Sequence, residues 1–404
     1  MKRSKIIISC LTILALIAGS QKIIGQTSDT KESVGLFPVQ VNSKYGYIDI
    51  IGKIVINPQF NEAYSFSEGL AKVMIQKMIN REYGYIDTTG MIVINPQFDE
   101  AWDFSESFAK VRIYAKYGFI DKTGKYIITP QFAAADDAFS EGLAAVKTRE
   151  GLWGYIDKTG MIVIKPQFGE AYSFSEGLAA VKIGFEYGFI DKTGKIVIKP
   201  QFENAYSFSK GLARMRAEVK VKRPGDIVAS MTVIRYGYID KTGKKVIKPQ
   251  FDMAWDFSEG LARVQPGGES RYGDATGKFG FIDTTGKYVI SPQFDRAWDF
   301  SEGLAMVGIG GKYGFIDKTG KYAISPQFDR PWDFSEGLAM VRIGDERTGK
   351  YGYIDKTGKF VINPQFDMAA SFSKGLAWVR IVDESTVKQG YIDKSGTYVW
   401  EPTK

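Results

Sequence analysis

The sequence predicts an all-β protein built as a tandem array of ten short antiparallel repeats. The string Tyr-Gly-Tyr-Ile-Asp begins at residue 45 and returns, with small changes, at 83, 117, 153, 187, 236, 279, 313, 351 and 389. The chain also contains 44 glycines, 27 Phe, 22 Tyr and 7 Trp. Glycine marks turns, whereas aromatic and β-branched residues favour strands. With 404 residues, 44% of them hydrophobic, the chain can form a large core.

The first twenty residues have the composition of a secretory signal. A basic start with Lys2, Arg3 and Lys5 precedes an apolar run over residues 6–18. This run is shorter than the ~20 residues of a membrane-spanning helix but has the length of a signal's hydrophobic region. Small residues follow, and we therefore expect cleavage near Ser20.

The expected domain organisation follows from this leader. Residues 1–20 form the signal peptide, residues 21–33 a flexible linker and residues 34–402 the repeat array. Cleavage near Gly25 is an alternative, and membrane attachment requires an uncleaved signal or lipidation at Cys10. Lipidation is disfavoured because the apolar run continues past that cysteine. We expect a secreted protein, or one of the periplasm or cell envelope.

Two absences restrict the chemistry of the chain. It contains no histidine, and its single cysteine lies in the leader. Ser-His-Asp and Cys-His catalysis, and thiolate or imidazole metal sites, are thereby excluded, and only paired-carboxylate chemistry remains. Without the three basic leader residues the formal charge falls from +7 to +4 (7 − 3), too little to indicate a nucleic-acid partner. We expect no enzyme, no cofactor and no metal.

Each repeat is predicted to contain three strands. They correspond to Gly-Leu-Ala-x-Val, to Tyr-Gly-Tyr-Ile-Asp and to a run such as Lys195–Ile198. Asp-Lys-Thr-Gly between the second and third runs is a tight hairpin signal, because Gly accepts positive φ. The Pro of the following Pro-Gln-Phe is expected to end the third strand, since it cannot donate to a ladder.

The segment between repeats is expected to plug the space between sheets. In the first copy Phe60, Ala63 and Phe66 are three residues apart, so short helical turns or an irregular loop would direct all three inward. The strands themselves place apolar side chains on both faces, and a lone three-stranded sheet buries too little surface. Neighbouring repeats must therefore cover one another. We expect an open, solenoid-like array, with a closed propeller-like ring as the alternative.

The repeat resembles that of the bacterial WG (KWG) repeat family. The residues that carry the resemblance are Lys-Tyr-Gly-Tyr-Ile-Asp-Lys-Thr-Gly-Lys-Ile-Val-Ile-Lys-Pro-Gln-Phe and the following Ala-Trp-Asp-Phe-Ser-Glu-Gly-Leu-Ala segment, over about residues 35–402. Only Leu152-Trp153-Gly154 has the Trp-Gly pair itself; Tyr, Phe or Gln precedes the Gly elsewhere. The resemblance implies no general biochemical activity.

Large length variation is confined to one hairpin of the repeat, between Ala-x-Val and Tyr-Gly-Tyr. Its longest versions are residues 216–235 and 265–278, in adjacent repeats. Insertions at one position of a repeat project from one face, often the binding face, although tolerated surface insertion is the simpler explanation. The longer insertion supplies the candidate binding residues Lys220, Lys222 and Arg223.

The recurring acidic residues are expected to have structural roles. Asp follows every Tyr-Ile, where a side chain that accepts a hydrogen bond from the backbone two residues on would start the turn. The Glu of Ser-Glu-Gly becomes Lys210 and Lys374 in two repeats, which favours a solvated turn surface.

One recurring aromatic position, which we call the slot, is the sharper binding candidate. It follows the recurring Ala and is occupied by Tyr64, Trp102, Tyr172, Tyr206, Trp255, Trp298 and Trp332. Repeated rings could stack on sugars or receive peptide side chains, whereas core packing is the structural alternative. We expect a non-enzymatic binding or scaffold module for an unknown protein or cell-envelope glycan. A purely structural envelope component and a carboxylate-dependent hydrolase are the alternatives.

Overall fold

The computed structural model of the chain describes residues 35–77, 80–222, 230–267, 277–345, 347–383 and 387–401. Within these ranges all regular elements are strands, and no helix there is long and apolar enough to cross a membrane. The predicted signal peptide and linker lie outside the described residues. Residues 33–404 form one structural unit, to which the following description applies.

Ten antiparallel repeats follow one another along the chain, each with its strands in sequence order. The first repeat comprises β1 (Phe37–Val41), β2 (Lys44–Ile48) and β3 (Ile54–Phe60). The second to fifth comprise β4 (Glu62–Ser67), β5 (Leu70–Lys77), β6 (Asn80–Asp87), β7 (Ile92–Phe98); β8 (Glu100–Ala101), β9 (Phe108–Ile113), β10 (Lys116–Asp121), β11 (Tyr126–Phe132); β12 (Ala134–Ala135), β13 (Leu143–Lys147), β14 (Trp153–Asp157), β15 (Ile162–Phe168); β16 (Glu170–Ala171), β17 (Leu178–Ile183), β18 (Glu186–Asp191) and β19 (Ile196–Phe202).

The sixth and seventh repeats share one seven-stranded sheet, because β23 runs on into the segment that pairs with β24. This sheet comprises β20 (Asn204–Ser209), β21 (Leu212–Lys222), β22 (Ser230–Ile239), β23 (Lys245–Ala254), β24 (Ala262–Pro266), β25 (Phe279–Ile282) and β26 (Tyr288–Phe294). The last three repeats comprise β27 (Arg296–Ala297), β28 (Ala305–Ile309), β29 (Lys312–Ile316), β30 (Tyr322–Phe328); β31 (Arg330–Ser335), β32 (Leu338–Ile343), β33 (Lys350–Ile354), β34 (Phe360–Phe366); β35 (Met368–Ala369), β36 (Ala377–Val382), β37 (Val387–Ile392) and β38 (Tyr398–Trp400).

The all-β tandem array is confirmed, and the three predicted strands of each repeat are present. The number of strands differs from the prediction: from the second repeat on, the connecting segment adds a fourth strand. In the second repeat Ala63 pairs with Val73, and Phe66 pairs with Ala71. The segment is therefore short strand rather than helical turn, since its backbone groups find partners on the neighbouring strand.

A bulge carries the third strand past its proline. Tyr45 pairs with Phe60 and Tyr47 with Ile56, so β3 has two more residues than β2 over this stretch. Pro58 lies in the extra loop of β3, where no ladder hydrogen bond is required of it. A Cβ on Gly46 would lie 2.3 Å from the Ile56 carbonyl oxygen, so the recurring glycine is required there. The expectation that proline ends the strand is wrong.

The core lies between consecutive repeats. Tyr47 and Phe60 of the first repeat pack with Phe66 and Val73 of the second in one buried cluster. The ring centroids of Tyr47 and Phe66 are 5.0 Å apart, and the Tyr47 hydroxyl donates to the Tyr64 carbonyl at 2.8 Å. Each such phenylalanine contributes about 1.5–3 kcal/mol by burial. The predicted inward role of the connecting segment is confirmed for this residue.

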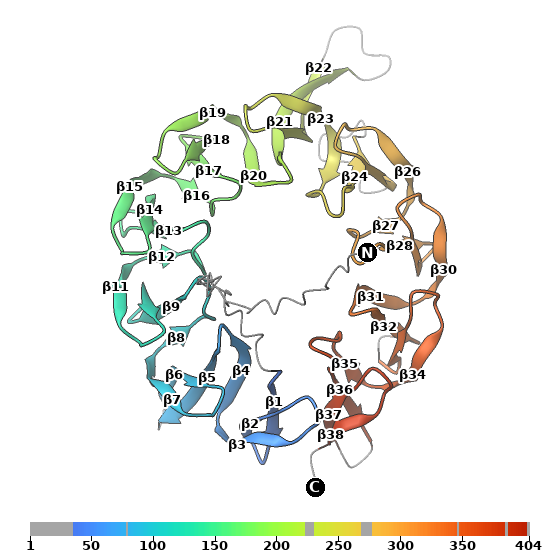
Figure 1. Cartoon of the computed structure of the whole chain (residues 1–404). Coiled ribbons are helices and arrows are strands. Elements are labelled where there is room, and N and C mark those ends of the chain that lie inside the picture. Colours follow the sequence, from blue (N-terminus) through green and yellow to red (C-terminus); the bar gives the residue numbers. More distant parts are fainter. Residues whose placement is uncertain are drawn as a thin grey trace, which may run out of the picture. The chain divides into compact units, whose positions relative to one another are not determined.

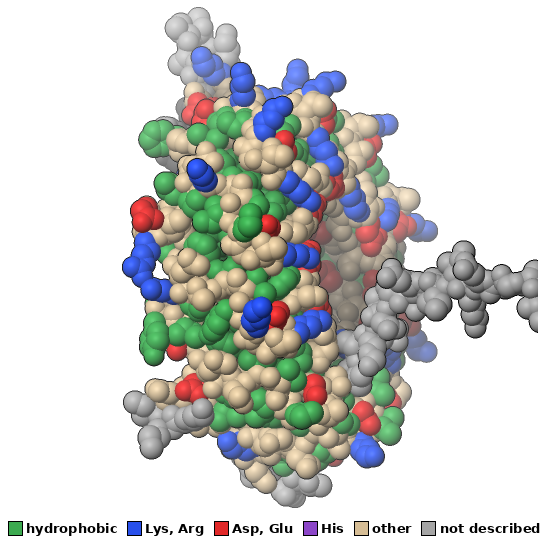
Figure 2. All heavy atoms as spheres, turned by 60° about the vertical axis from the view of Figure 1, so that its left-hand side comes forward, with side chains coloured by type: hydrophobic (Ala, Val, Ile, Leu, Met, Phe, Trp, Pro, Cys, Tyr) green, Lys and Arg blue, Asp and Glu red, His purple; other side chains and the backbone are tan. Residues whose placement is uncertain are grey.

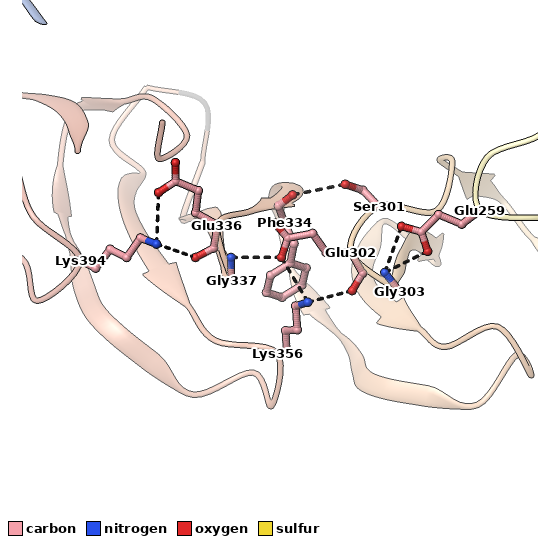
Figure 3. A network of polar contacts seen from close by, with 9 residues as sticks. All are labelled: Glu259, Ser301, Glu302, Gly303, Phe334, Glu336, Gly337, Lys356 and Lys394. Atoms are coloured by element: carbon pink, nitrogen blue, oxygen red, sulfur yellow. Dashed lines mark hydrogen bonds and ion pairs between the residues drawn. The ribbon is translucent and has the colours of Figure 1, made fainter. Parts of the chain in front are cut away.

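A polar clasp also joins consecutive repeats (Figure 3). The Glu302 carboxylate accepts a hydrogen bond from the Gly337 amide at 3.1 Å and pairs with Lys356 at 3.1 Å. The Ser301 hydroxyl donates to the Phe334 carbonyl at 3.4 Å. Equivalent ion pairs are Glu68–Lys122, Glu106–Lys158, Glu141–Lys192, Glu176–Lys241, Glu259–Lys318 and Glu336–Lys394. The Glu of Ser-Glu-Gly is thus an inter-repeat contact and not merely turn surface.

The two repeats that replace this Glu by Lys also lack the lysine partner. Lys210 of the sixth repeat corresponds to Thr284 of the seventh, where other repeats have the clasp lysine. Lys374 of the tenth repeat corresponds to Ile50 of the first. A lysine facing a lysine would be repelled, so the charge change and the loss of the partner belong together.

The first and last repeats pack against each other, and the repeats therefore close into a ring (Figure 1). Phe37 and Leu376 share a buried cluster, and the Phe37 and Tyr391 rings are 5.4 Å apart. The Tyr391 hydroxyl donates to the Pro38 carbonyl at 3.1 Å. The array thus follows the closed alternative and not the favoured open one. Among the described residues no strand of one end pairs with a strand of the other, so side-chain packing and this hydrogen bond make the contact.

Removing one clasp charge should reduce stability in a pH-dependent way. The hydrogen bond from Lys318 lowers the pKa of Glu259, although burial opposes this. The resulting stabilisation is present above the ordinary Glu pKa and disappears as the pH falls through the lowered value. We expect Glu259→Gln to lower the free energy of unfolding by about 0.5–1 kcal/mol at neutral pH, a value discounted for exposure. Denaturant titrations should show this difference shrink as the pH falls below the ordinary range of Glu titration.

Lys210→Gln is the matched control, because its repeat has no clasp to lose. An equal loss in both variants, or a Glu259→Gln effect independent of pH, would contradict the assignment of the clasp.

Ring closure is tested by Phe37→Ala. Removing this buried ring should cost about 3 kcal/mol and leave part of Leu376 uncovered. Hydrogen exchange should accelerate in β1, β2 and β36–β38 while the fourth and fifth repeats keep their protection. Unchanged exchange in the last repeat would show that the two ends do not support each other.

Candidate binding site

Six of the seven slot aromatics lie in or beside the short strands nearest the centre of the ring (Figure 1), and Trp255 follows the end of the longer strand β23. All of the seven except Tyr64 are half-buried, and Tyr64 is 36% exposed. Each ring contacts the aromatic residue that opens Tyr-Gly-Tyr in the same repeat, at centroid distances of 5.5–6.5 Å. One face of each ring thus supports the sheet. The slot aromatics are therefore neither fully exposed rings free to stack on a ligand nor fully buried core residues.

The slot also lies at the hairpin end of each repeat. The contact between Trp332 and Tyr351 is next to the β32–β33 hairpin, and that between Tyr206 and Tyr236 is next to β21–β22. The structure therefore brings both predicted features, the slot aromatics and the variable hairpins, to one side of the ring.

Lys220 lies farther along the longest hairpin than Tyr236, the residue that contacts the slot aromatic Tyr206. Lys220 is exposed on β21, Lys222 ends that strand and Arg223 lies outside the described residues. The base of this hairpin is structural instead, because Arg235 is buried and pairs with Asp252 at 2.5 Å.

The two longest insertions meet at that buried arginine. A Cβ on Gly267, in the seventh repeat, would lie 2.5 Å from the Nε atom of Arg235 in the sixth. The two longest insertions thus occur in adjacent repeats where they pack against each other, which their lengths alone did not reveal.

A cation covers the slot ring in four repeats. It is the variable residue of Leu-Ala-x-Val, which sequence reasoning had not singled out. Its charged group lies 3.8–4.1 Å from the ring centroid in the pairs Lys72–Tyr64, Lys110–Trp102, Arg214–Tyr206 and Arg263–Trp255. Such contacts are worth about 0.5–2 kcal/mol each, more when the cation is desolvated.

Each of these cations also reaches the next repeat. Arg263 donates to the Ala297 carbonyl, and its Nε lies 3.5 Å from an Asp299 carboxylate oxygen. Burial lowers the pKa of Arg263 and raises that of Asp299, and their mutual attraction opposes both shifts. The cation thus lies between its own slot ring and the acidic residue that follows the next slot. We call this arrangement the cation junction.

A cleft of about 790 Å³ opens between the eighth and ninth repeats. Trp298, Tyr313 and Met306 line it from the eighth repeat, and Trp332 and Asp333 from the ninth. Arg296, Arg330 and Arg342 face it together with Asp329 and Asp345, so its charged lining is balanced. Burial raises the pKa of Asp333 and nearby Asp299 raises it further, whereas the attraction of Arg263 opposes both effects.

The recurring Asp residues start turns, as predicted. Asp191 accepts hydrogen bonds from the Thr193 amide at 2.9 Å and the Lys195 amide at 3.1 Å, and the Thr193 hydroxyl bond lowers its pKa. The other nine repeats have the same acceptor arrangement. Among the described residues no group of three acidic side chains is placed to hold a metal ion.

The outward face of the ring is a second, weaker candidate surface. Figure 2 shows hydrophobic side chains spread over the visible part of it with basic residues among them. Exposed pairs such as Ile162 and Val163 begin the outermost strand of several repeats. Single apolar residues on a surface are ordinary.

Comparisons with known proteins agree with the repeat analysis. The model of the WG containing repeat matches residues 45–77, 83–117, 117–151, 153–184, 187–218, 236–268, 279–313, 313–346 and 351–383. No curated protein matches the sequence.

Solved structures that match this chain include BamB from Moraxella catarrhalis, with 11% identity, coverage of 86% of this chain and 97% of that one, and a TM-score of 0.34. Apo AztD from Citrobacter koseri has 12% identity, coverage of 75% and 93%, and a TM-score of 0.31. Hsv2 from Kluyvelomyces marxianus has 11% identity, coverage of 65% and 94%, and a TM-score of 0.32. These scores are too low to carry an inference. The family matches span most of the ten repeats, and the chain belongs to the family of WG containing repeat proteins.

Proposed function

We propose that this protein is a non-enzymatic, exported binding module that engages a partner protein on the hairpin side of its ring. The observation that carries the proposal is the cleft between the eighth and ninth repeats. Two tryptophans, three arginines and three aspartates face this cleft. Trp and Arg are the residues most often found at the energetic centre of protein interfaces.

A protein partner fits this lining better than an envelope glycan. Charges of both signs together with aromatic rings match a polypeptide that carries charged side chains, whereas neutral sugars need mainly stacking and hydroxyl partners. The signal-like leader supports a location outside the cytoplasm. N-terminal sequencing of the protein from envelope and culture fractions tests this, and an intact leader in the cytoplasm would contradict it.

A pull-down from envelope extract tests the binding role. We expect Trp298→Ala together with Trp332→Ala to reduce retention of the captured protein at least tenfold, because truncated interface anchors cost about 1.4 kcal/mol or more. Tyr172→Ala, a slot aromatic of the fifth repeat away from the cleft, is the matched control and should retain the partner. Circular dichroism and thermal unfolding confirm that each bait is folded.

The alternatives make different predictions in the same assay. Equal retention by all three baits would favour a purely structural envelope component. Retention on an immobilised glycan, lost in the double variant, would replace the protein partner by a sugar.

A further inference from the structure

Two positions vary together across the repeat junctions. The first is the variable residue of Leu-Ala-x-Val, and the second follows the slot of the next repeat. A cation at the first accompanies an acid at the second in Lys72/Asp103, Lys110/Asp137, Arg214/Asp256 and Arg263/Asp299. A neutral residue at the first accompanies serine at the second in Pro38/Ser65, Ala145/Ser173, Ala180/Ser207 and Met340/Ser371.

One junction breaks this pattern, and it is the junction that contains the cleft. Met306 of the eighth repeat precedes Asp333 of the ninth. Here the acid is present without its cation. Among the described residues, no hydrogen bond or ion pair reaches the Asp333 carboxylate, which Arg263 attracts only at longer range, and no cation lies over the Trp298 ring.

The remaining parts of a cation junction are in place there. Trp298 contacts Tyr313 at 5.6 Å, as Trp255 contacts Phe279 at 5.8 Å in the preceding repeat. Pro331 occupies the position of Ala297, whose carbonyl oxygen receives the Arg263 guanidinium. Met306 lines the cleft with an uncharged, flexible side chain.

We propose that this cleft binds a lysine or arginine side chain of the partner protein, which completes the cation junction that the chain leaves open. The guest cation lies over Trp298, donates to the Pro331 carbonyl and pairs with Asp333. The inference deepens the proposed function and rests on it for the identity of the ligand as a protein.

The arginines of the cleft refine the ligand. Asp329 pairs with Lys312 and accepts the Gly344 amide, and Asp345 accepts the Arg347 and Thr348 amides, so these two carboxylates are already engaged. Arg296 and Arg330 are exposed, and the Arg330 guanidinium lies 5.5 Å from the Trp332 ring centroid. They favour acidic residues next to the guest's basic residue.

Filling the site from within provides a test that needs no partner. We expect Met306→Arg to raise the melting temperature, because the new guanidinium takes the place that Arg263 has one repeat earlier. Asp333→Asn should abolish this gain in the double variant. Met340→Arg is the matched control: it also follows a slot tryptophan, but it meets Ser371 and should give no gain.

The inference requires that the new arginine pairs with Asp333. A rise in melting temperature that persists in Asp333→Asn, or an equal rise for Met306→Arg and Met340→Arg, would overturn it. Because Met306 is buried, the arginine variant also tests packing, and direct binding is therefore measured as a second readout.

The binding probe is the peptide acetyl-Gly-Glu-Arg-Glu-Gly-amide, with citrulline in place of arginine as its neutral, isosteric control. By calorimetry, the arginine peptide should bind at least tenfold more tightly than the citrulline peptide. Asp333→Asn and Met306→Arg should remove that preference, whereas Met340→Arg should keep it. Equal binding of the two peptides, or a preference unaffected by Asp333→Asn, would overturn the inference.

Agmatine distinguishes a small cation from a polypeptide. Binding of agmatine as tight as that of the arginine peptide would mean that the site takes free amines and not a protein side chain. If Asp333→Asn retains the partner in the pull-down while the double tryptophan variant loses it, the proposed function stands and this inference fails.

Discussion

The whole structure depends on the need of each small sheet to have both of its apolar faces covered. A sheet of three or four short strands cannot bury enough surface alone, and each repeat therefore uses its neighbours as the other half of its core. Phe66 and its equivalents make this contact, because each reaches from one repeat to the tyrosine or phenylalanine of the preceding one. Ring closure applies the same principle to the two ends, where Phe37 and Tyr391 meet.

Hydrophobic packing between near-identical surfaces does not by itself specify how they align. Directional polar contacts do this, and the clasp supplies them at seven junctions through Glu–Lys pairs; at six of these the carboxylate also accepts a hydrogen bond from a backbone amide. Glu–Lys pairs at a half-exposed surface contribute little energy each. Their value lies in repetition, and in the consistent loss of both partners where Lys210 and Lys374 occur.

The cation junction shows how one architectural device can become a binding site. In four repeats a lysine or arginine covers the slot ring and pairs with the next repeat. Replacing that cation by methionine while keeping the acid leaves the exposed Asp333 carboxylate in the cleft without a close cation. A guest from another molecule would take the place that lysine or arginine fills at the other junctions, and those junctions show the geometry that the guest must reproduce.

Local sequence determined the strands, the Asp turns, the ten repeats and their mutual dependence, because these follow from patterns only a few residues long. The slot aromatics and the variable hairpins were also identifiable from the sequence. Three features required the tertiary structure: the fourth strand, the closure of the ring, and the pairing of Met306 with Asp333. Each depends on contacts between repeats, and local sequence patterns do not specify which residue of one repeat contacts which residue of the next. These contacts are fixed by how the sheets stack, and the stacking forms only when all the repeats pack together.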